Sequence, residues 1–209
     1  MTTRWEAEGL FVKVCGLGSP ADVEAAAEAG ADGVGFVFWE PSPRHHDLPT
    51  IRRLAEASPV TTVLVTVDLD SEDLLAAAAQ AGVDAVQPHG RHSGVAAAAA
   101  RRFGLGVICP IRAGEEPPAE ARDELLLIDT PHASLPGGTG ETFDWDTIAH
   151  LERRFLLAGG LDPENVAAAV RRVRPFGVDA SSGLESSPGV KDHARIRDFV
   201  KVAKEAHRS

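Results

Sequence analysis

Two side chains that can carry charge share one face of the apolar segment FVKVCG, residues 11–16. Successive side chains of a strand point to opposite faces, so Lys13 and Cys15 point the same way. A thiol exchanges its proton at moderately alkaline pH, and a buried lysine is costly unless a carboxylate pairs with it. We therefore expect Lys13 to pair with an acidic residue, with Asp179 as the first candidate, and Cys15 to end its strand where chemistry takes place.

Further ionisable residues stand at or after the ends of other apolar runs. Asp129 ends LLLID, His89 ends AVQPH, and Arg44 lies in WEPSPRHHD directly after GFVF. Taken alone, each has a common structural role: an aspartate caps a helix, and an arginine carries a solvated loop charge. A lone cysteine such as Cys15 is usually a small buried hydrophobe. His89 and Asp179 stay open between ligand and structural roles.

Two turns rich in glycine and serine follow the last two apolar runs, each just before a helical segment. They contain Gly159 and Gly160, and then Ser181, Ser182 and Gly183. Backbone N–H groups at the start of a helix bind phosphate without needing a lysine. These turns therefore predict a phosphate-binding site.

Eight β-rich runs alternate with alanine-rich helical segments, and these elements must position the residues above. We expect strands at residues 11–15, 33–38, 61–68, 85–89, 106–111, 125–129, 155–159 and 176–181. Alternation of this kind indicates an α/β protein with a parallel sheet. An open doubly wound sheet is possible, but eight β/α units are what a closed (β/α)8 TIM barrel needs. We expect one such barrel, forming a single domain over residues 1–209.

Helix signals support the same pattern. One helix is expected over residues 20–30, a second over 71–82 with Ser71 as its cap, and a third over 162–173 with Asp162 as its cap. The last helix is expected over residues 192–207, whereas the acidic, proline-broken stretch 112–124 is expected to be a loop with a short helix.

In a barrel, function gathers where the strands end at their carboxyl termini. Phosphate sites in barrels usually follow strands seven and eight, where the two turns lie. The fold would thus bring Cys15, Arg44, His89, Asp129, Asp179 and both turns to one mouth.

Composition sets outer bounds. The net charge of −10 argues against nucleic-acid or anionic-membrane partners, and no apolar run is long enough to span a membrane. The N-terminus lacks the layout of a signal peptide, so we expect a cytoplasmic protein. The two cysteines form neither a disulfide framework nor a zinc motif, and His45 and His46 have no third ligand at suitable spacing, so no metal is expected.

Taken together and in order, six motifs resemble the phosphoribosylanthranilate isomerase family of tryptophan biosynthesis. They are VKVCG, GFVFWEPSPR, VQPHG, LLLIDT…GGTGETFDW, GGLDPENV and VRPFGVDASSGLESSPGVKD, and they span roughly residues 12–200. The resemblance implies a cofactor-free Amadori rearrangement of N-(5′-phosphoribosyl)anthranilate into an open-chain aminoketose phosphate. Its small-molecule partner is a phosphosugar, and the chain is expected to be a monomer or homodimer.

The resemblance also implies roles for individual residues. The family's general base and general acid fall on Cys15 and Asp129, and its carboxylate-binding arginine falls on Arg44. Asp129 would protonate the furanose ring oxygen, and Cys15 would remove the C2′ proton. His89 and Asp179 are further candidate substrate-binding residues. Ordinary pKa values oppose both catalytic roles, so Cys15 needs nearby positive charge, and Asp129 needs burial or nearby negative charge.

The sequence departs from the family pattern on strands three to five. Pro88 stands where leucine is usual, Cys109-Pro110 where a lysine-alanine pair is common, and Leu64 and Thr66 where glycine and phenylalanine are usual. We expect these changes to affect the anthranilate side of the pocket rather than the reaction.

Two alternatives remain. One is a dual-substrate isomerase that also accepts an intermediate of histidine biosynthesis, but such enzymes rely on paired aspartates, and Cys15 argues against it. The other is an inactive barrel that only binds a phosphorylated ligand or a partner protein, which the combination of Cys15, Asp129 and Arg44 disfavours.

Overall fold

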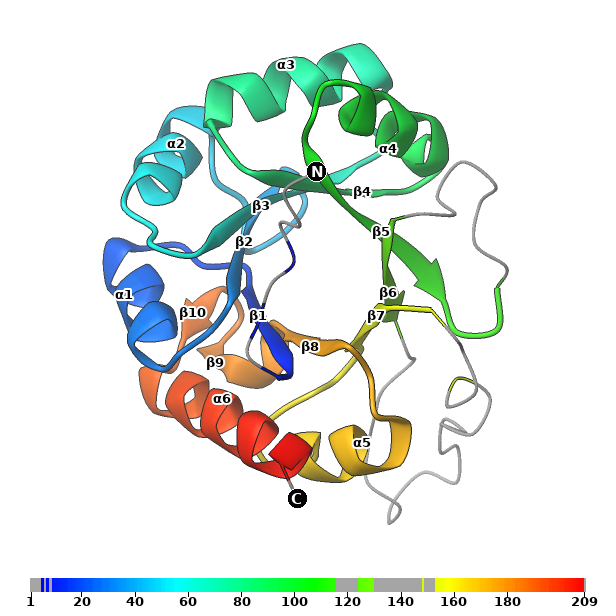
Figure 1. Cartoon of the computed structure of the whole chain (residues 1–209). Helices are drawn as coiled ribbons and strands as arrows, with labels where there is room; N and C mark the ends of the chain where they lie inside the picture. Colours follow the sequence, from blue (N-terminus) through cyan, green and yellow to red (C-terminus); the bar gives the residue numbers. More distant parts are fainter. Residues whose placement is uncertain are drawn as a thin grey trace.

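Eight parallel strands close into a barrel in a computed structural model that describes residues 5, 7, 9–115, 124–129, 148 and 153–208 (Figure 1). Each strand pairs with the next one in sequence, and the eighth returns to the first. The strands are β1 (Phe11–Cys15), β2 (Gly33–Phe38), β3 (Thr61–Val67), β4 (Ala85–His89), β5 (Gly106–Arg112), β6 (Leu125–Asp129), β7 (Phe155–Ala158) and β8 (Gly177–Ala180). The predicted (β/α)8 barrel is confirmed, and the open doubly wound sheet is excluded.

Helices cover the outside of this barrel next to β1 to β5 and next to β7 and β8 (Figure 1). Those in the described part of the chain are α1 (Pro20–Glu28), α2 (Leu48–Glu56), α3 (Ser71–Ala81), α4 (Ser93–Arg102), α5 (Val166–Val173) and α6 (His193–Arg208). Their buried faces form one large apolar cluster with the outward side chains of the strands, such as Val14, Leu64 and Leu126. None of these helices is long and apolar enough to cross a membrane.

A second apolar cluster fills the inside of the barrel, including Phe11, Val63 and Leu127. At the end of the barrel where the strands begin, the ring of Trp5 meets Phe11 edge-on, with ring centroids 5.8 Å apart. Phe11 also stacks on Phe176 at the same centroid distance. Because side chains close this end of the barrel, a ligand must enter from the opposite end.

Two predicted helix starts are wrong by a few residues. The cap of α3 is Asp70, whose carboxylate accepts from the backbone N–H groups of the first turn, and Ser71 is the first helical residue. In the same way, the Asp162 carboxylate holds a turn that precedes α5, which begins only at Val166. Most of the predicted loop 112–124 lies outside the described residues.

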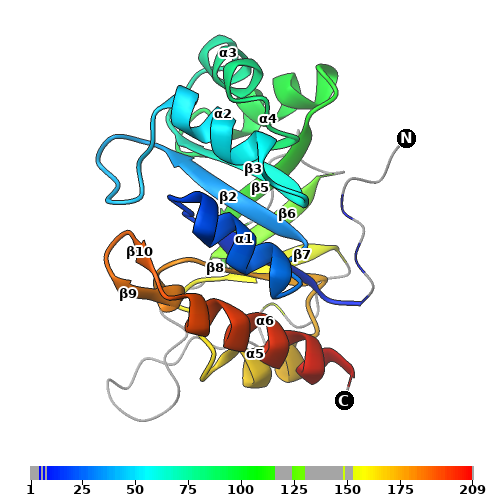
Figure 2. The ribbon, with the colours of Figure 1, turned by 90° about the vertical axis from the view of Figure 1, so that its left-hand side faces the viewer.

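A short hairpin after β8 has no counterpart among the predicted elements. A single turn of 3₁₀ helix (Ser182–Leu184) leads into β9 (Glu185–Ser187) and β10 (Val190–Lys191), which pair antiparallel. Figure 2 shows the hairpin on the same side of the barrel as the loop from β2 to α2. The two segments touch, since a Cβ atom added to Gly189 would lie 2.5 Å from the carbonyl oxygen of Pro43.

Candidate active site

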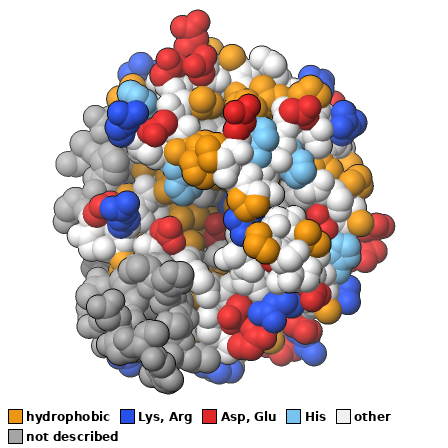
Figure 3. Space-filling view, turned by 180° about the vertical axis from the view of Figure 1, so that it is seen from behind, with side chains coloured by type: hydrophobic (Ala, Val, Ile, Leu, Met, Phe, Trp, Pro, Cys, Tyr) orange, Lys and Arg blue, Asp and Glu red, His pale blue; other side chains and the backbone are white. Residues whose placement is uncertain are grey.

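The carboxyl ends of the strands open on the face opposite to the view of Figure 1. Figure 3 shows this face hollowed near its centre, where a basic side chain lies among apolar and acidic ones. A cavity of about 220 Å³ lies here, between β4, β6, β7 and β8. Most of the predicted site residues line it, namely His89, Asp129, Gly159, Gly160, Asp179, Ser181 and Ser182. Gly183 packs directly against the backbone of Leu161, another lining residue.

Cys15 and Lys13 lie beside this cavity, inside the barrel and near the carboxyl end of β1. Lys13 is fully buried, and its Nζ donates to Oδ1 of Asp179 at 2.9 Å, which confirms the predicted pairing. A Cβ atom added to Gly35 on β2 would lie 2.8 Å from Sγ of Cys15 and 3.2 Å from Nζ of Lys13. The thiol and the ammonium group are therefore neighbours, and glycine at position 35 makes room for both.

This neighbourhood decides the charge states of both groups. Burial would lower the pKa of Lys13, but the charges of Asp179 and Cys15 outweigh it and raise that pKa above its ordinary value. Burial raises the pKa of the Cys15 thiol, and the positive charges of Lys13 and Lys191 oppose that rise. Lys13 therefore stays charged and stabilises the thiolate form of its neighbour.

Arg44 reaches the same place from the loop after β2. A Cβ atom added to Gly16 would lie 2.6 Å from Cδ of Arg44 and 3.0 Å from Oγ of Ser181. Gly16 has φ +74°, a conformation that favours glycine. The glycine directly after Cys15 therefore lets the strand turn away and lets the arginine cross its end.

The guanidinium of Arg44 is held by a carboxylate that sequence reasoning missed. Nε donates to Oε1 of Glu185 at 2.6 Å, and Nη2 donates to Oε2 at 2.7 Å. This bidentate pair occupies one edge of the planar guanidinium. Within the described residues no group accepts from Nη1, so the other edge is available for a second anion.

Lys191, also missed from sequence, binds the same carboxylate. Its Nζ lies 2.8 Å from Oε1 of Glu185 and 2.9 Å from the carbonyl oxygen of Ser181, and its side chain is fully buried. The signal that could have pointed to both residues is the motif LESSPGVKD, in which a glutamate and a lysine flank a turn.

His89 projects into the cavity from the end of β4. Its pKa is lowered to about 4 by burial and by the charge of Lys13, so the imidazole is neutral near pH 7. Nε2 of His89 lies 2.9 Å from Nε2 of Gln87, which makes His89 Nε2 the acceptor and places its proton on Nδ1. Gln87 was not predicted as a site residue, although strand alternation puts it on the same face as His89.

The two predicted phosphate turns are fixed through their carbonyl groups. Nδ2 of Asn165 donates to the carbonyl of Gly160 at 2.9 Å, and Nζ of Lys191 donates to that of Ser181. The N–H of a trans peptide points opposite to its carbonyl, so the N–H groups of Leu161 and Ser182 point the other way. Both of these residues line the cavity.

Asp129 lines the cavity from the end of β6, and its side chain is exposed there. The described protein residues therefore do not bury this carboxyl group, which was one of the two conditions expected to preserve its proton.

Most of the sequence departures lie on the outward side of strands β3 to β5, and their effect on the anthranilate side of the pocket stays a prediction. Leu64 and Cys109 belong to the apolar cluster between strands and helices, not to the barrel interior. Alternation places Thr66 and Pro88 on the same outward side, since Val65 and Ala85 point inward. Only Pro110 shares the inward face of β5 with Ile108.

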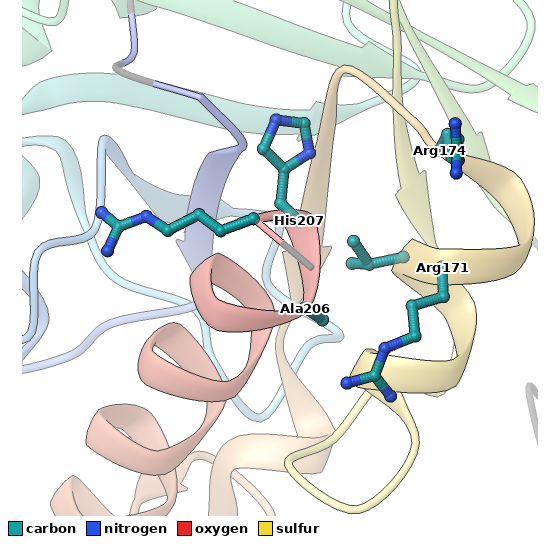
Figure 4. A pocket seen from close by; sticks show the side chains of 6 residues that line it. Arg171, Arg174, Ala206 and His207 are labelled. Atoms are coloured by element: carbon teal, nitrogen blue, oxygen red, sulfur yellow. The ribbon is translucent and has the colours of Figure 1, made fainter.

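A larger cavity of about 640 Å³ lies between α5 and α6 and is lined by several cationic side chains. Figure 4 shows Arg171, Arg174 and His207 projecting in different directions rather than toward one point. These residues end their helices, where cations interact favourably with the helix dipole. The barrel mouth, where the predicted site residues gather, is therefore the candidate active site. Among the described residues no cluster of His, Cys, Asp and Glu is arranged to hold a metal ion.

Comparison with known proteins agrees with this geometry. The family model for N-(5′phosphoribosyl)anthranilate (PRA) isomerase matches residues 12–202. The chain belongs to this isomerase family. A phosphoribosylanthranilate isomerase from Cereibacter sphaeroides is 44% identical over 210 residues, covering 94% of this chain and 99% of that protein.

Solved structures of the isomerase family share the barrel. TrpF from Jonesia denitrificans superposes with a TM-score of 0.84 at 42% identity, covering 94% of this chain and 98% of that chain. A phosphoribosyl anthranilate isomerase crystallised with reduced 1-(o-carboxyphenylamino)-1-deoxyribulose 5-phosphate superposes with a TM-score of 0.79 at 35% identity, covering 94% and 99%. These comparisons confirm the family that the sequence motifs resemble and its assignment as an isomerase.

Proposed function

We propose that the protein converts N-(5′-phosphoribosyl)anthranilate into 1-(o-carboxyphenylamino)-1-deoxyribulose 5-phosphate by general acid–base catalysis. The observation that carries this proposal is the placement of Cys15, with its buried lysine neighbour, at the same barrel mouth as Asp129. A family member has been solved with a reduced form of that product, which supports the choice of substrate.

The substrate has an anion at each end, and the mouth offers a site for each. The phosphate would be bound by backbone N–H groups of the turns at Gly159-Gly160 and Ser181–Gly183. The anthranilate carboxylate would bind the Nη1 edge of Arg44, whose opposite edge is fixed by Glu185. His89 and Asp179 complete the proposed binding residues, with neutral His89 able to donate from Nδ1.

Ring opening is the first chemical step. Asp129 donates a proton to the furanose ring oxygen while the bond from that oxygen to C1′ breaks. The lone pair of the anilino nitrogen forms a double bond to C1′, which gives a cationic Schiff base and leaves Asp129 ionised. Because Asp129 is exposed in the described structure, negative charge of the bound substrate would help it to keep its proton beforehand.

Proton removal from C2′ is the second step. The Cys15 thiolate takes the proton, and the electrons of the C–H bond form a C1′–C2′ double bond as the nitrogen recovers its lone pair. The resulting enolamine becomes the ketone when its C2′ hydroxyl loses a proton to water and C1′ gains one from water. Proton exchange with water also returns Asp129 to its acid form and Cys15 to its thiolate form. A raised thiol pKa makes the thiolate scarcer but also a stronger base, and Lys13 limits the loss.

Each step is a proton transfer or a ring opening, so the proposal assigns no cofactor and no metal. A single domain over residues 1–209, a cytoplasmic location, a monomeric or homodimeric state and the absence of nucleic-acid and membrane partners remain predictions from the sequence.

Turnover tests the proposal. Phosphoribosylanthranilate is generated in the cuvette, and loss of its fluorescence is followed after the protein is added. We expect catalysed loss. A protein that binds the product analogue but shows no turnover would instead be the inactive barrel, and equal turnover of the histidine-pathway substrate would indicate the dual enzyme.

A further inference from the structure

We infer that Lys191 is a positioning residue that fixes both substrate-binding ends of the site at once. It would hold Arg44 through Glu185, and the phosphate turn through the carbonyl of Ser181. This inference rests on the proposed function, because the two ends are defined by the substrate's carboxylate and phosphate.

The contacts of Lys191 use all of its hydrogen-bonding capacity. Its Nζ lies 2.8 Å from Oε1 of Glu185, 2.9 Å from the carbonyl oxygen of Ser181 and 3.5 Å from Oγ of Ser181. An ammonium group has three N–H donors, and each has a partner here. Since the side chain is also fully buried, Lys191 acts on these groups rather than on the substrate.

The first arm runs through Glu185. Its two oxygens accept from Nε and Nη2 of Arg44, and Oε2 also accepts from the backbone N–H of Gly189 at 3.2 Å. Burial would raise the pKa of Glu185, but the hydrogen bonds from Arg44 and Lys191 hold it below its ordinary value. Glu185 therefore stays ionised between two cations, and the trio keeps one net positive charge for an incoming carboxylate.

The second arm runs through the peptide between Ser181 and Ser182. Its carbonyl accepts from Lys191 and from the backbone N–H of Leu184 at 3.1 Å. With the carbonyl held in this way, the N–H of Ser182 points to the opposite side, and Ser182 lines the cavity. Without Lys191, one of the two anchors of this peptide is lost.

The two arms come from a segment that reaches both ends of the site. Glu185 and Lys191 lie in the hairpin β9–β10, which contacts the loop carrying Arg44 and follows directly from the phosphate turn. One buried cation in this hairpin therefore sets the spacing between the two anion sites.

Binding of two substrate fragments tests the inference, with inorganic phosphate probing one end and anthranilate the other. Dissociation constants are measured by NMR titration, which needs no turnover. For Lys191→Met we expect both dissociation constants to rise about tenfold or more, and KM to rise more than kcat falls. Lys191→Arg keeps the charge and should recover part of the loss for anthranilate.

Two control variants separate the arms. Glu185→Gln should weaken anthranilate binding but leave phosphate binding within about twofold. Asn165→Ala, which removes the hydrogen bonds to the Gly160 carbonyl and from the Asp162 N–H, should weaken phosphate binding but leave anthranilate binding within about twofold. If Lys191 acts through Glu185, the effects of Glu185→Gln and Lys191→Met on anthranilate binding should not add. The double variant should then have a dissociation constant no higher than the higher of the two single-variant values. If Lys191→Met does not fold, Lys191→Gln removes the charge while keeping a polar side chain and takes its place.

The inference is overturned if a folded Lys191 variant binds either fragment as wild type does, or if the two substitutions add fully for anthranilate. Different experimental results contradict the inference about Lys191 and the proposed function. Wild-type turnover with unchanged fragment binding in the variant contradicts only the inference, whereas absent turnover contradicts the proposed function. Fragments that fail to bind the wild type contradict the inference, and wild-type turnover still decides the proposed function.

Discussion

Nζ of Lys13 and Oδ1 of Asp179 meet at 2.9 Å across the β1–β8 pair, beside the thiol of Cys15. The pair explains why a strand inside an apolar barrel carries a lysine. A buried ammonium needs a carboxylate partner, and once paired it supplies positive charge to the thiol two residues further along.

Replacement of Lys13 by methionine should raise the pKa of Cys15 further, because it removes the largest favourable charge acting on the thiolate. We expect lower kcat near neutral pH and an alkylation rate of Cys15 that rises only at higher pH than in wild type. The double variant Lys13→Met/Asp179→Asn avoids leaving a carboxylate unpaired and serves as the folded reference. Coinciding pH profiles for wild type and both variants would show that Lys13 does not act on the thiol.

Replacement of Gly35 by alanine should disturb the same pair sterically. The new methyl group would lie 2.8 Å from Sγ of Cys15 and 3.2 Å from Nζ of Lys13, so one of them must move. We expect kcat to fall by about a hundredfold, within the range of a lost general base. Gly33→Ala is the matched control, because it lies on the same strand face but meets the ring of Phe11 on the barrel floor. It should lower the melting temperature while kcat stays near wild type, and equal loss of kcat in both would count against the account.

Arg44→Lys should raise KM about tenfold or more with a smaller change in kcat, because an ammonium group cannot bind Glu185 bidentately and still present a second edge to the substrate. Steady-state kinetics measure both constants. Arg52→Lys is the matched control, since Arg52 forms an exposed pair with Glu56 on α2, and it should change neither constant. An unchanged KM in Arg44→Lys would remove Arg44 from the binding site.

His89 should make stability depend on pH on the acid side. Its folded pKa is lowered to about 4, whereas an unfolded histidine titrates near 6.5, so between these values the unfolded state binds more protons. The free energy of unfolding should therefore fall as pH drops from about 6.5 toward 4, by up to about 3 kcal/mol from this group. Urea unfolding of wild type and His89→Asn across this range measures the contribution. Equal slopes in the two proteins would contradict a neutral His89 in the folded state.

The barrel was predictable because each of its eight strands can be recognised from its own short stretch of sequence. Runs such as FVKVC and TTVLVTV are apolar, β-branched and bounded by polar or turn residues. The pairing of Lys13 with Asp179 was predictable too, because a lysine on an inward face must find a carboxylate at the same depth of the barrel.

The hairpin and its charges were not predictable by the same means. Strands of three and two residues, as in β9 and β10, are too short to show alternation. Glu185 is 141 residues from Arg44 in sequence, and nothing local indicates that these two side chains meet. The predicted caps Ser71 and Asp162 are wrong because Asp70 and Asn165, close to them in sequence, are residue types that favour helix caps as well. The sequence pattern does not single out one residue of each pair.

The central claim is that Cys15 acts as the general base and Asp129 as the general acid. Turnover by Cys15→Ala and Asp129→Asn, measured beside wild type, tests this claim most directly. Both variants should lose about 10²–10⁴-fold in kcat, as expected for a lost proton-transfer group, while still binding inorganic phosphate and anthranilate like wild type. A variant that keeps kcat within about tenfold of wild type would contradict the role assigned to the residue it lacks.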